Sequence, residues 1–309
     1  MNKWCLWLVI AGSVCFSSSP YAQEDLWDDQ MEQAMEALRK ADLPNALKLA
    51  TIAVRQSEYE NADRHVTSLA LLARIAQDSG DLSGAERALR RAIEIIDRVP
   101  GPMQQDKAVL YNNLGSLLDL SGDLPAAEQH YRSALALHRE IRAVRTEDRF
   151  SLLVNLAGLM ERRNDQVGAR KLYVEAESLL PNLPVAASIT LYNNLGTLLQ
   201  RSGNSSAAQI HLARALASLP PDNSQPLLRA TLLHNLGTAE LEVGDLAAAT
   251  IHLHEAESVR RGRLGDRHTD TARTLSSIAL LLEKQNNPQA ALKVSRESSA
   301  IIGASTAMT

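Results

Sequence analysis

The chain has 309 residues, of which 45% are hydrophobic, 22% are charged and 4% are aromatic, and its formal net charge at pH 7 is −4. This composition is typical of a globular protein with ample material for a hydrophobic core. Because the chain has a small acidic excess, it has no basic field that would attract nucleic acid or an anionic membrane. The low content of aromatic residues excludes a base-stacking surface.

The first 22 residues have the pattern of a secretory signal peptide. Lys3 and the terminal amine give a positive start, and residues 4–16 form an apolar stretch that is too short to span a membrane. Small residues follow, and we place the cleavage site after Ala22, with a retained N-terminal anchor as the alternative. We therefore expect an extracytoplasmic protein, either periplasmic or secreted.

Both cysteines, Cys5 and Cys15, lie within this N-terminal segment. The mature chain would contain no cysteine, so a disulfide, a thiolate nucleophile and a cysteine-ligated metal are excluded. No later stretch is long and apolar enough to cross a bilayer. We expect the mature protein to consist of one helical repeat domain at residues 23–302 and a flexible tail at residues 303–309.

An internal repeat dominates the rest of the chain. A small residue recurs every 39 to 42 residues within a helical apolar pattern, and an alanine follows each one twelve residues later. A near-constant period of this length is typical of a solenoid of stacked helix pairs. The small residues are Ala34, Ala73, Gly115, Ala157, Gly196, Gly237 and Ala279, and the alanines are Ala46, Ala85, Ala127, Ala169, Ala208, Ala249 and Ala291.

The pattern predicts seven helix pairs in chain order. The first pair has Gln33 where five later pairs have leucine and the last has isoleucine, and the seventh has Ser295 and Ser298 on its second helix. Terminal repeats are often atypical because their outer faces meet solvent. The turns SGD at 79–81 and 121–123, SGN at 202–204 and GD at 244–245 place a glycine to end the first helix and an Asp or Asn to cap the second.

The motif YNNLG occurs twice, at 111–115 and at 192–196, and HNLG follows at 234–237. With Ala127, Tyr131 and Ala134, this pattern resembles the tetratricopeptide repeat family. The period exceeds the usual 34 residues and is similar to the long-repeat, kinesin light chain-like variant. Over residues 27–302 the resemblance implies an all-α, right-handed superhelical solenoid of about seven helix–turn–helix repeats. It also implies a concave face of first helices that binds extended peptides or proteins and performs no catalysis.

Four asparagines share one register position, two residues before the small residue of the first helix: Asn113, Asn155, Asn194 and Asn235. Core packing does not explain them, because a buried amide without partners costs about 1–3 kcal/mol. One interpretation is that each amide bonds to a neighbouring repeat. The interpretation that we favour is a ladder along the concave groove, because an amide both donates and accepts and so suits a peptide backbone. The resemblance implies the same contact.

Small or polar residues lie three positions after the asparagines and share their face, which leaves room for a ligand. The candidate partner-binding residues are therefore Asn113, Ser116, Asn155, Asn194, Thr197, Asn235 and Thr238. Repeated lysine–asparagine sets that would clamp a C-terminal carboxylate are absent. A neutral groove for an internal peptide segment is therefore favoured over a carboxylate clamp.

No motif for catalysis, metal binding or cofactor binding is present, so we expect neither an enzyme nor a cofactor. The basic stretch at residues 260–268 is interpreted as a solvated turn between repeats six and seven, with a rim contact for an acidic partner as the alternative. The favoured function is an exported scaffold that binds peptide or protein partners in its groove. The alternative is a structural subunit of a cell-envelope assembly that docks through its convex face or its ends.

Overall fold

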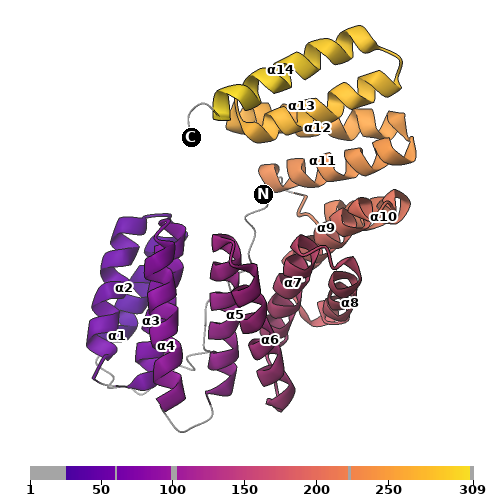
Figure 1. Cartoon of the computed structure of the whole chain (residues 1–309). Helices are drawn as coiled ribbons and strands as arrows, with labels where there is room; N and C mark the ends of the chain where they lie inside the picture. The colour runs from indigo at the N-terminus through magenta and orange to yellow at the C-terminus, as the bar shows by residue number, and fades with distance from the viewer. Residues whose placement is uncertain (1–25, 60, 99–102, 222–223, 307–309) are drawn as a thin grey trace. The chain divides into compact units, whose positions relative to one another are not determined.

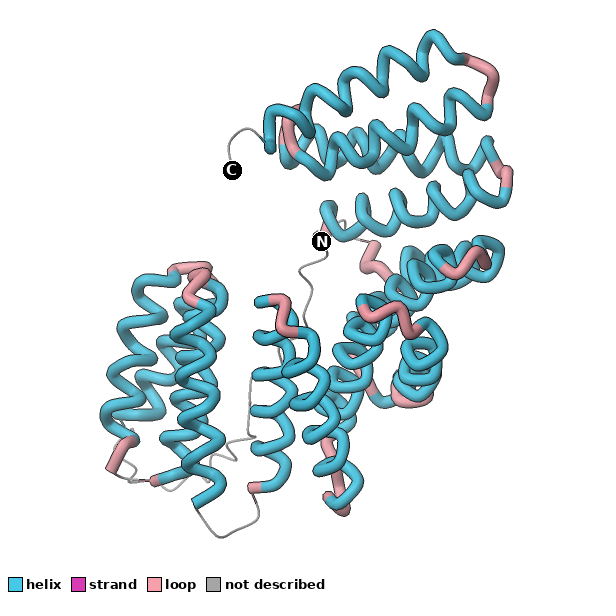
Figure 2. The backbone as a smooth tube through the Cα atoms, in the orientation of Figure 1, coloured by secondary structure: helices cyan, strands magenta, loops and turns pink. Residues whose placement is uncertain are grey.

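The computed structural model describes residues 26–59, 61–98, 103–221 and 224–306, and these contain helices joined by short loops (Figures 1 and 2). The chain forms two compact units, Met1–Asp165 and Gln166–Thr309. The expected signal peptide lies outside the described residues. None of the described helices has the length and hydropathy needed to cross a membrane.

Unit 1 contains three helix pairs followed by one further helix. In each pair a short turn reverses the chain, and the second helix packs on the first helix of the next pair. The helices are α1 (Leu26–Arg39), α2 (Leu43–Ser57), α3 (Ala62–Asp78), α4 (Leu82–Arg98), α5 (Gln104–Ser121), α6 (Leu124–Glu140) and α7 (Thr146–Arg162).

Unit 2 begins with α8, which packs on α9, and continues with three helix pairs of the same kind. Its elements are α8 (Gln166–Glu177), the 3₁₀ turn η1 (Leu180–Asn182), α9 (Val185–Arg201), α10 (Ser205–Ala217), α11 (Pro226–Val243), α12 (Leu246–Leu264), α13 (Thr269–Lys284) and α14 (Pro288–Thr306). The all-α fold of helix–turn–helix repeats that the sequence predicts is therefore confirmed.

The seven turns within the predicted helix pairs all contain one residue with a positive φ, and all seven are described. Four are the expected glycines, such as Gly122 at φ 89°, and the following Asp123 accepts a hydrogen bond from Ala126 N as the helix cap. The other three are Ala41, Asn164 and Asn286, at φ 57° to 62°. The repeat geometry therefore imposes the left-handed conformation even where the sequence has no glycine.

The expected close approach of the two helices in a pair is confirmed by the glycines. A Cβ atom added to Gly115 would lie 2.8 Å from Tyr131 Cδ1, and one added to Gly196 would lie 2.6 Å from Leu212 Cγ. The alanines of the second helices, from Ala46 to Ala291, are at most 1% exposed. Small residues thus allow the backbones to approach, while larger apolar side chains fill the space beside them.

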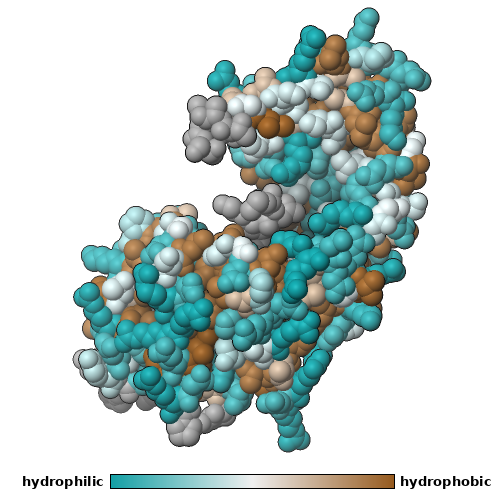
Figure 3. All heavy atoms as spheres, in the orientation of Figure 1, coloured by the Kyte–Doolittle hydropathy of each residue, from teal (hydrophilic) through white to brown (hydrophobic). Residues whose placement is uncertain are grey.

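The last helix pair ends the described array with a polar face. Ser295 and Ser299 are exposed at the register positions that Leu212 and Leu216 occupy in α10. Ser298 differs, because it is 2% exposed and donates a hydrogen bond of 2.7 Å to the carbonyl of Ala272. On the face drawn in Figure 3, hydrophobic and hydrophilic residues are interspersed within each unit.

Two boundaries differ from the sequence prediction. Helix α14 continues to Thr306, so the tail expected from residue 303 begins inside the helix. Neither a proline nor a helix-ending turn interrupts the chain at residue 303, so the helix propagates. Helix α12 continues to Leu264, and the first half of the basic stretch at 260–268 is therefore helix rather than turn.

Candidate functional site

The first helices of unit 2 present a row of side-chain amides and hydroxyls. Helices α9 and α11 carry the YNNLG and HNLG motifs at the same register, so equivalent side chains of two successive repeats share one face. We call this set the amide face, and it consists of Asn193, Asn194, Thr197, Asn235 and Thr238.

A hydrogen bond between two asparagines links the first helices of successive repeats in each unit. Asn235 Nδ2 donates to Asn193 Oδ1 over 2.8 Å, which joins α11 to α9. Asn155 Nδ2 donates to Asn112 Oδ1 over 3.1 Å, which joins α7 to α5. A bond to a neighbouring repeat, one of the two interpretations of these asparagines, is therefore confirmed for Asn155 and Asn235.

A second link lies near the C-terminal ends of the same helices. In unit 1 the guanidinium of Arg162 pairs with the carboxylate of Asp119, and burial raises the pKa of that carboxyl although Arg162 opposes the change. In unit 2 Gln200 Nε2 donates to Glu242 Oε1 over 3.0 Å. The first helices of successive repeats are thus held together at two levels, which fixes the spacing of the side chains between them.

The predicted binding residues divide by exposure. In unit 1 Asn113, Ser116 and Asn155 are 3%, 2% and 8% exposed, so they present almost no area to a ligand in this conformation. In unit 2 the four predicted residues are partly exposed, namely Asn194, Thr197, Asn235 and Thr238. The structure therefore brings the unit 2 residues together on an accessible face.

The amide face retains one donor and one acceptor that are not used within the described part of the chain. The bond from Asn235 Nδ2 to Asn193 fixes the orientation of the Asn235 amide and leaves Asn235 Oδ1 without a partner. Asn194 Oδ1 accepts from Asn193 Nδ2 over 3.4 Å, which leaves Asn194 Nδ2 without a partner. The threonine hydroxyls offer no further donor, because Thr197 and Thr238 each donate to the carbonyl of the asparagine three residues before, but their oxygens can still accept.

Sequence reasoning missed several buried polar side chains at the junctions between repeats. Arg260 on α12 and His138 on α6 are 3% and 4% exposed. They lie eleven residues after Ala249 and Ala127, the repeat alanines of their helices, at a position that faces the start of the next repeat. Burial lowers the pKa of His138, and neither of its ring nitrogens has a hydrogen-bond partner in the described chain. An alignment of the repeats could have revealed both polar residues, because the apolar Ile96 and Leu219 occupy the same position in other repeats.

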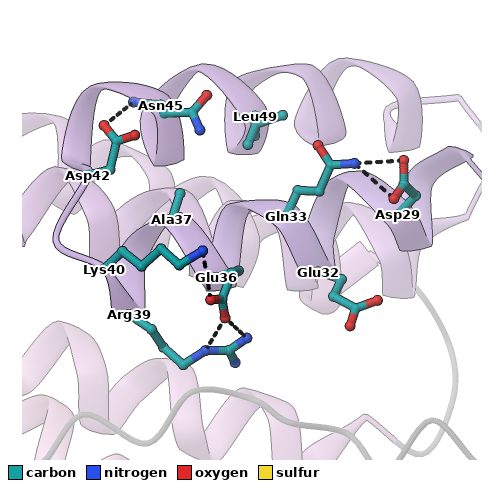
Figure 4. A pocket seen from close by; sticks show the side chains of 10 residues that line it. All are labelled: Asp29, Glu32, Gln33, Glu36, Ala37, Arg39, Lys40, Asp42, Asn45 and Leu49. Carbon is teal, nitrogen blue, oxygen red and sulfur yellow. Dashed lines mark hydrogen bonds and ion pairs between the residues drawn. The ribbon is translucent and has the colours of Figure 1, made fainter.

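A surface pocket of about 510 Å³ lies between α1 and α2, but its charges are largely paired with one another (Figure 4). Gln33 donates to Asp29 over 2.9 Å, and Glu36 pairs with Lys40 at 3.1 Å and with Arg39. Among the described residues no three His, Cys, Asp or Glu side chains are grouped so that they could hold a metal. The amide face is therefore the better candidate.

Comparison with known proteins relates two segments of the chain to a family. A family model described as tetratricopeptide repeat matches residues 65–140 and 228–302. These segments are tetratricopeptide repeats. The second segment contains α11, α12 and α13, so the tetratricopeptide repeats include Asn235 and Thr238 of the amide face. No curated protein matches the chain by sequence.

Solved structures agree on the tetratricopeptide repeat fold. BtubC (BKLC) from P. vanneervenii is 24% identical, with 72% of this chain and 92% of that chain covered and a TM-score of 0.65. The apo form of RapI is 16% identical, with 90% and 76% covered and a TM-score of 0.69. A Rap protein complexed with competence and sporulation factor is 15% identical, with 89% and 76% covered and a TM-score of 0.60.

Proposed function

We propose that the chain is a scaffold that binds an extended segment of a partner protein along the amide face. The unused donor of Asn194 and the unused acceptor of Asn235 carry this proposal. A peptide backbone offers one N–H and one C=O for each residue, so such a pair can bind it with little dependence on its sequence. The bond between Asn235 and Asn193 holds the acceptor in place before a ligand arrives, which lowers the entropy cost of binding.

The fold supports this proposal. Tetratricopeptide repeats are typical of protein–protein interaction modules, and the Rap protein with a TM-score of 0.60 was crystallised with competence and sporulation factor. Contacts of Asn113, Ser116 and Asn155 with a partner stay a prediction, because these side chains are buried and neighbouring groups would have to move first. The proposal includes no catalytic residue, cofactor or metal.

We further propose that the protein is exported, on the evidence of the N-terminal sequence. The positive start and the 13-residue apolar stretch after it support a signal peptide cleaved after Ala22. N-terminal sequencing of the protein from a periplasmic or secreted fraction is expected to begin at Gln23. Protein that begins at Met1 and stays in the cytosolic fraction would contradict export.

A second candidate function is docking into a larger envelope assembly through the second helices. Five large apolar side chains on the second helices of unit 2 are more than half exposed: Val167 at 68%, Val174 at 54%, Ile210 at 57%, Ile251 at 65% and Leu292 at 53%. Ile210 and Ile251 lie at the same register, two residues after the repeat alanines Ala208 and Ala249. Exposed apolar residues that recur at one register favour a protein contact on this side.

Replacing Asn194 with alanine is expected to reduce partner capture about fivefold, because one hydrogen bond contributes about 1 kcal/mol to binding. The melting temperature should change little, because the amide is partly exposed and only its acceptor is used, in a long bond. The measurement combines thermal melting with quantitative mass spectrometry of protein captured from a periplasmic extract.

Asn155→Ala is the matched control, because it removes the buried donor to Asn112 and leaves Asn112 Oδ1 unpaired. We expect this variant to lose about 1–3 kcal/mol of stability. Unchanged capture by the Asn194→Ala variant together with a lower melting temperature would show that the amide face is structural only.

A further inference from the structure

Arg260 is a buried cation whose hydrogen bonds go to neutral groups. The residue is 3% exposed, and its Nη1 donates to the carbonyl oxygen of Asp270 over 3.0 Å and to Thr274 Oγ1 over 2.6 Å. It forms no ion pair with a carboxylate in the described part of the chain. A guanidinium has five N–H donors, so these two bonds leave several of them unused.

The repeat does not require a charge at this position. Ile96 and Leu219 occupy the equivalent position at two other junctions, and both are apolar. Burying an unpaired charge is costly, and an apolar side chain of similar volume is often more stable at such a place. Packing between repeats six and seven therefore does not account for Arg260.

A second cation contacts the same residue, Asp270, as this guanidinium, and an imidazole with an unpartnered nitrogen is close enough to be affected by both charges. The side chain of Arg273, on the first helix of repeat seven, is 49% exposed and lies 3.3 Å from the Asp270 carboxylate. His234 on α11 is 7% exposed, and its Nδ1 has no hydrogen-bond partner in the described chain. Burial, together with the charges of Arg260 and Arg273, lowers the pKa of His234 to about 3. The carboxylate of Asp270 opposes this positive potential.

His234 also borders the amide face. It directly precedes Asn235 and lies at the register of Asn112 and Asn193, each of which accepts a bond from an asparagine of the next repeat. Repeat seven has Ser277 at the position of the donors Asn155 and Asn235. The equivalent bond to His234 is therefore missing, and His234 Nδ1 has no partner in the described chain. The charge of Arg260, which has no ion pair, and the unpartnered Nδ1 of His234 therefore both lie where the amide face meets repeat seven.

We propose that His234, Arg260 and Arg273, here called the arginine corner, bind an anionic oxygen group of the partner segment, a carboxylate or a phosphate. This inference rests on the proposed function, because it places an acidic group of the bound segment next to the amide face. The side chain of Arg273 is 49% exposed and makes the first contact, whereas Arg260 and His234 are buried and are reached only after neighbouring groups move. The planar guanidinium group matches the two oxygens of such an anion. An anion at this point would neutralise the buried charge that the protein leaves without an ion pair.

The test uses small anions, so that it does not depend on a partner. The full chain, with labelled arginine and histidine side chains, is titrated by NMR with sodium phosphate, with sodium acetate and with sodium chloride at constant ionic strength. We expect saturable shifts of the Arg273 and His234 resonances with phosphate or acetate but not with chloride. The preferred anion identifies the group as phosphate or carboxylate. Shifts that do not saturate, or that chloride reproduces, would overturn the proposal.

Variants separate an anion site from a structural role. Arg273→Gln is expected to weaken anion binding at least about tenfold, the effect of losing about 1.4 kcal/mol, whereas Arg263→Gln, at an exposed arginine of α12, should not. Arg260→Met should fold, as judged by circular dichroism, and lose anion binding. A folded Arg260→Met or Arg273→Gln variant with unchanged anion affinity would overturn the proposal. The Asn194→Ala variant should keep anion binding, so the proposal for the amide face and the proposal for the arginine corner are tested independently.

Discussion

Replacing Gly196 with alanine is expected to lower the free energy of unfolding by about 1–3 kcal/mol, although alanine is the better helix former. The new Cβ would lie 2.6 Å from Leu212 Cγ, 2.9 Å from Leu212 Cδ2 and 3.3 Å from the carbonyl oxygen of Ala208. Leu212 is 0% exposed, so it cannot move away without disturbing its neighbours. The overlap therefore outweighs the gain of about 1 kcal/mol in helix propensity.

Gly262→Ala is the matched control, because Gly262 lies inside α12 of the same unit and an added Cβ would meet nothing within 4 Å. This variant should gain up to about 1 kcal/mol, so the two substitutions are expected to have opposite signs. Urea unfolding followed by circular dichroism measures both. A neutral or stabilised Gly196→Ala variant would contradict the close approach of α9 and α10.

Acidification from pH 7 to pH 4 is expected to cost unit 2 about 3 kcal/mol of stability through His234 alone. Its pKa is about 3 in the folded protein and near its usual value of 6.5 in the unfolded chain. The unfolded chain therefore binds more protons between these two values. The stability that the neutral imidazole of His234 contributes is fully present above about pH 6.5 and is lost as the pH falls toward 3.

The substitution His234→Asn isolates this effect, because asparagine already occupies the equivalent position at Asn112 and Asn193. The variant should resemble the parent at pH 7 and retain about 3 kcal/mol more stability than the parent at pH 4. His254→Asn, at an exposed histidine, serves as the control. Urea unfolding at four pH values between 4 and 7 provides the comparison, and parallel pH profiles for parent and His234→Asn would contradict a buried neutral imidazole.

Much of the fold could be predicted because the packing of paired helices requires small residues at regular intervals in the sequence. Gly115, Gly196 and Gly237 are small because a neighbouring side chain occupies the space of a Cβ, and the other four repeats have alanine at this position. The turn residues were predicted less completely. Ala41, Asn164 and Asn286 adopt the same left-handed conformation as the glycines. Asparagine tolerates this conformation better than most residues but also occurs outside it, and alanine disfavours it. The packing of the two helices imposes it.

The candidate site was predictable only in part. The register of the asparagines indicated a polar role that core packing does not explain, and the bonds from Asn155 to Asn112 and from Asn235 to Asn193 show that two of them contact the neighbouring repeat. Exposure could not be predicted, since equivalent positions in different repeats have different surroundings. Asn113 is 3% exposed, for example, whereas Asn194 is partly exposed. Arg260 was interpreted as part of a solvated turn, and this was wrong, because α12 continues past it and buries its side chain.

Site-specific photocrosslinking tests most directly whether the amide face of unit 2 binds the partner. A photoreactive amino acid is placed at Thr197 or Thr238 on the amide face and at Ile210 or Ile251 on the second helices, and partner adducts are compared in cells. The proposed function predicts adducts from Thr197 and Thr238 and none from Ile210 and Ile251. Adducts from the isoleucine positions alone would contradict it and would support docking through the second helices.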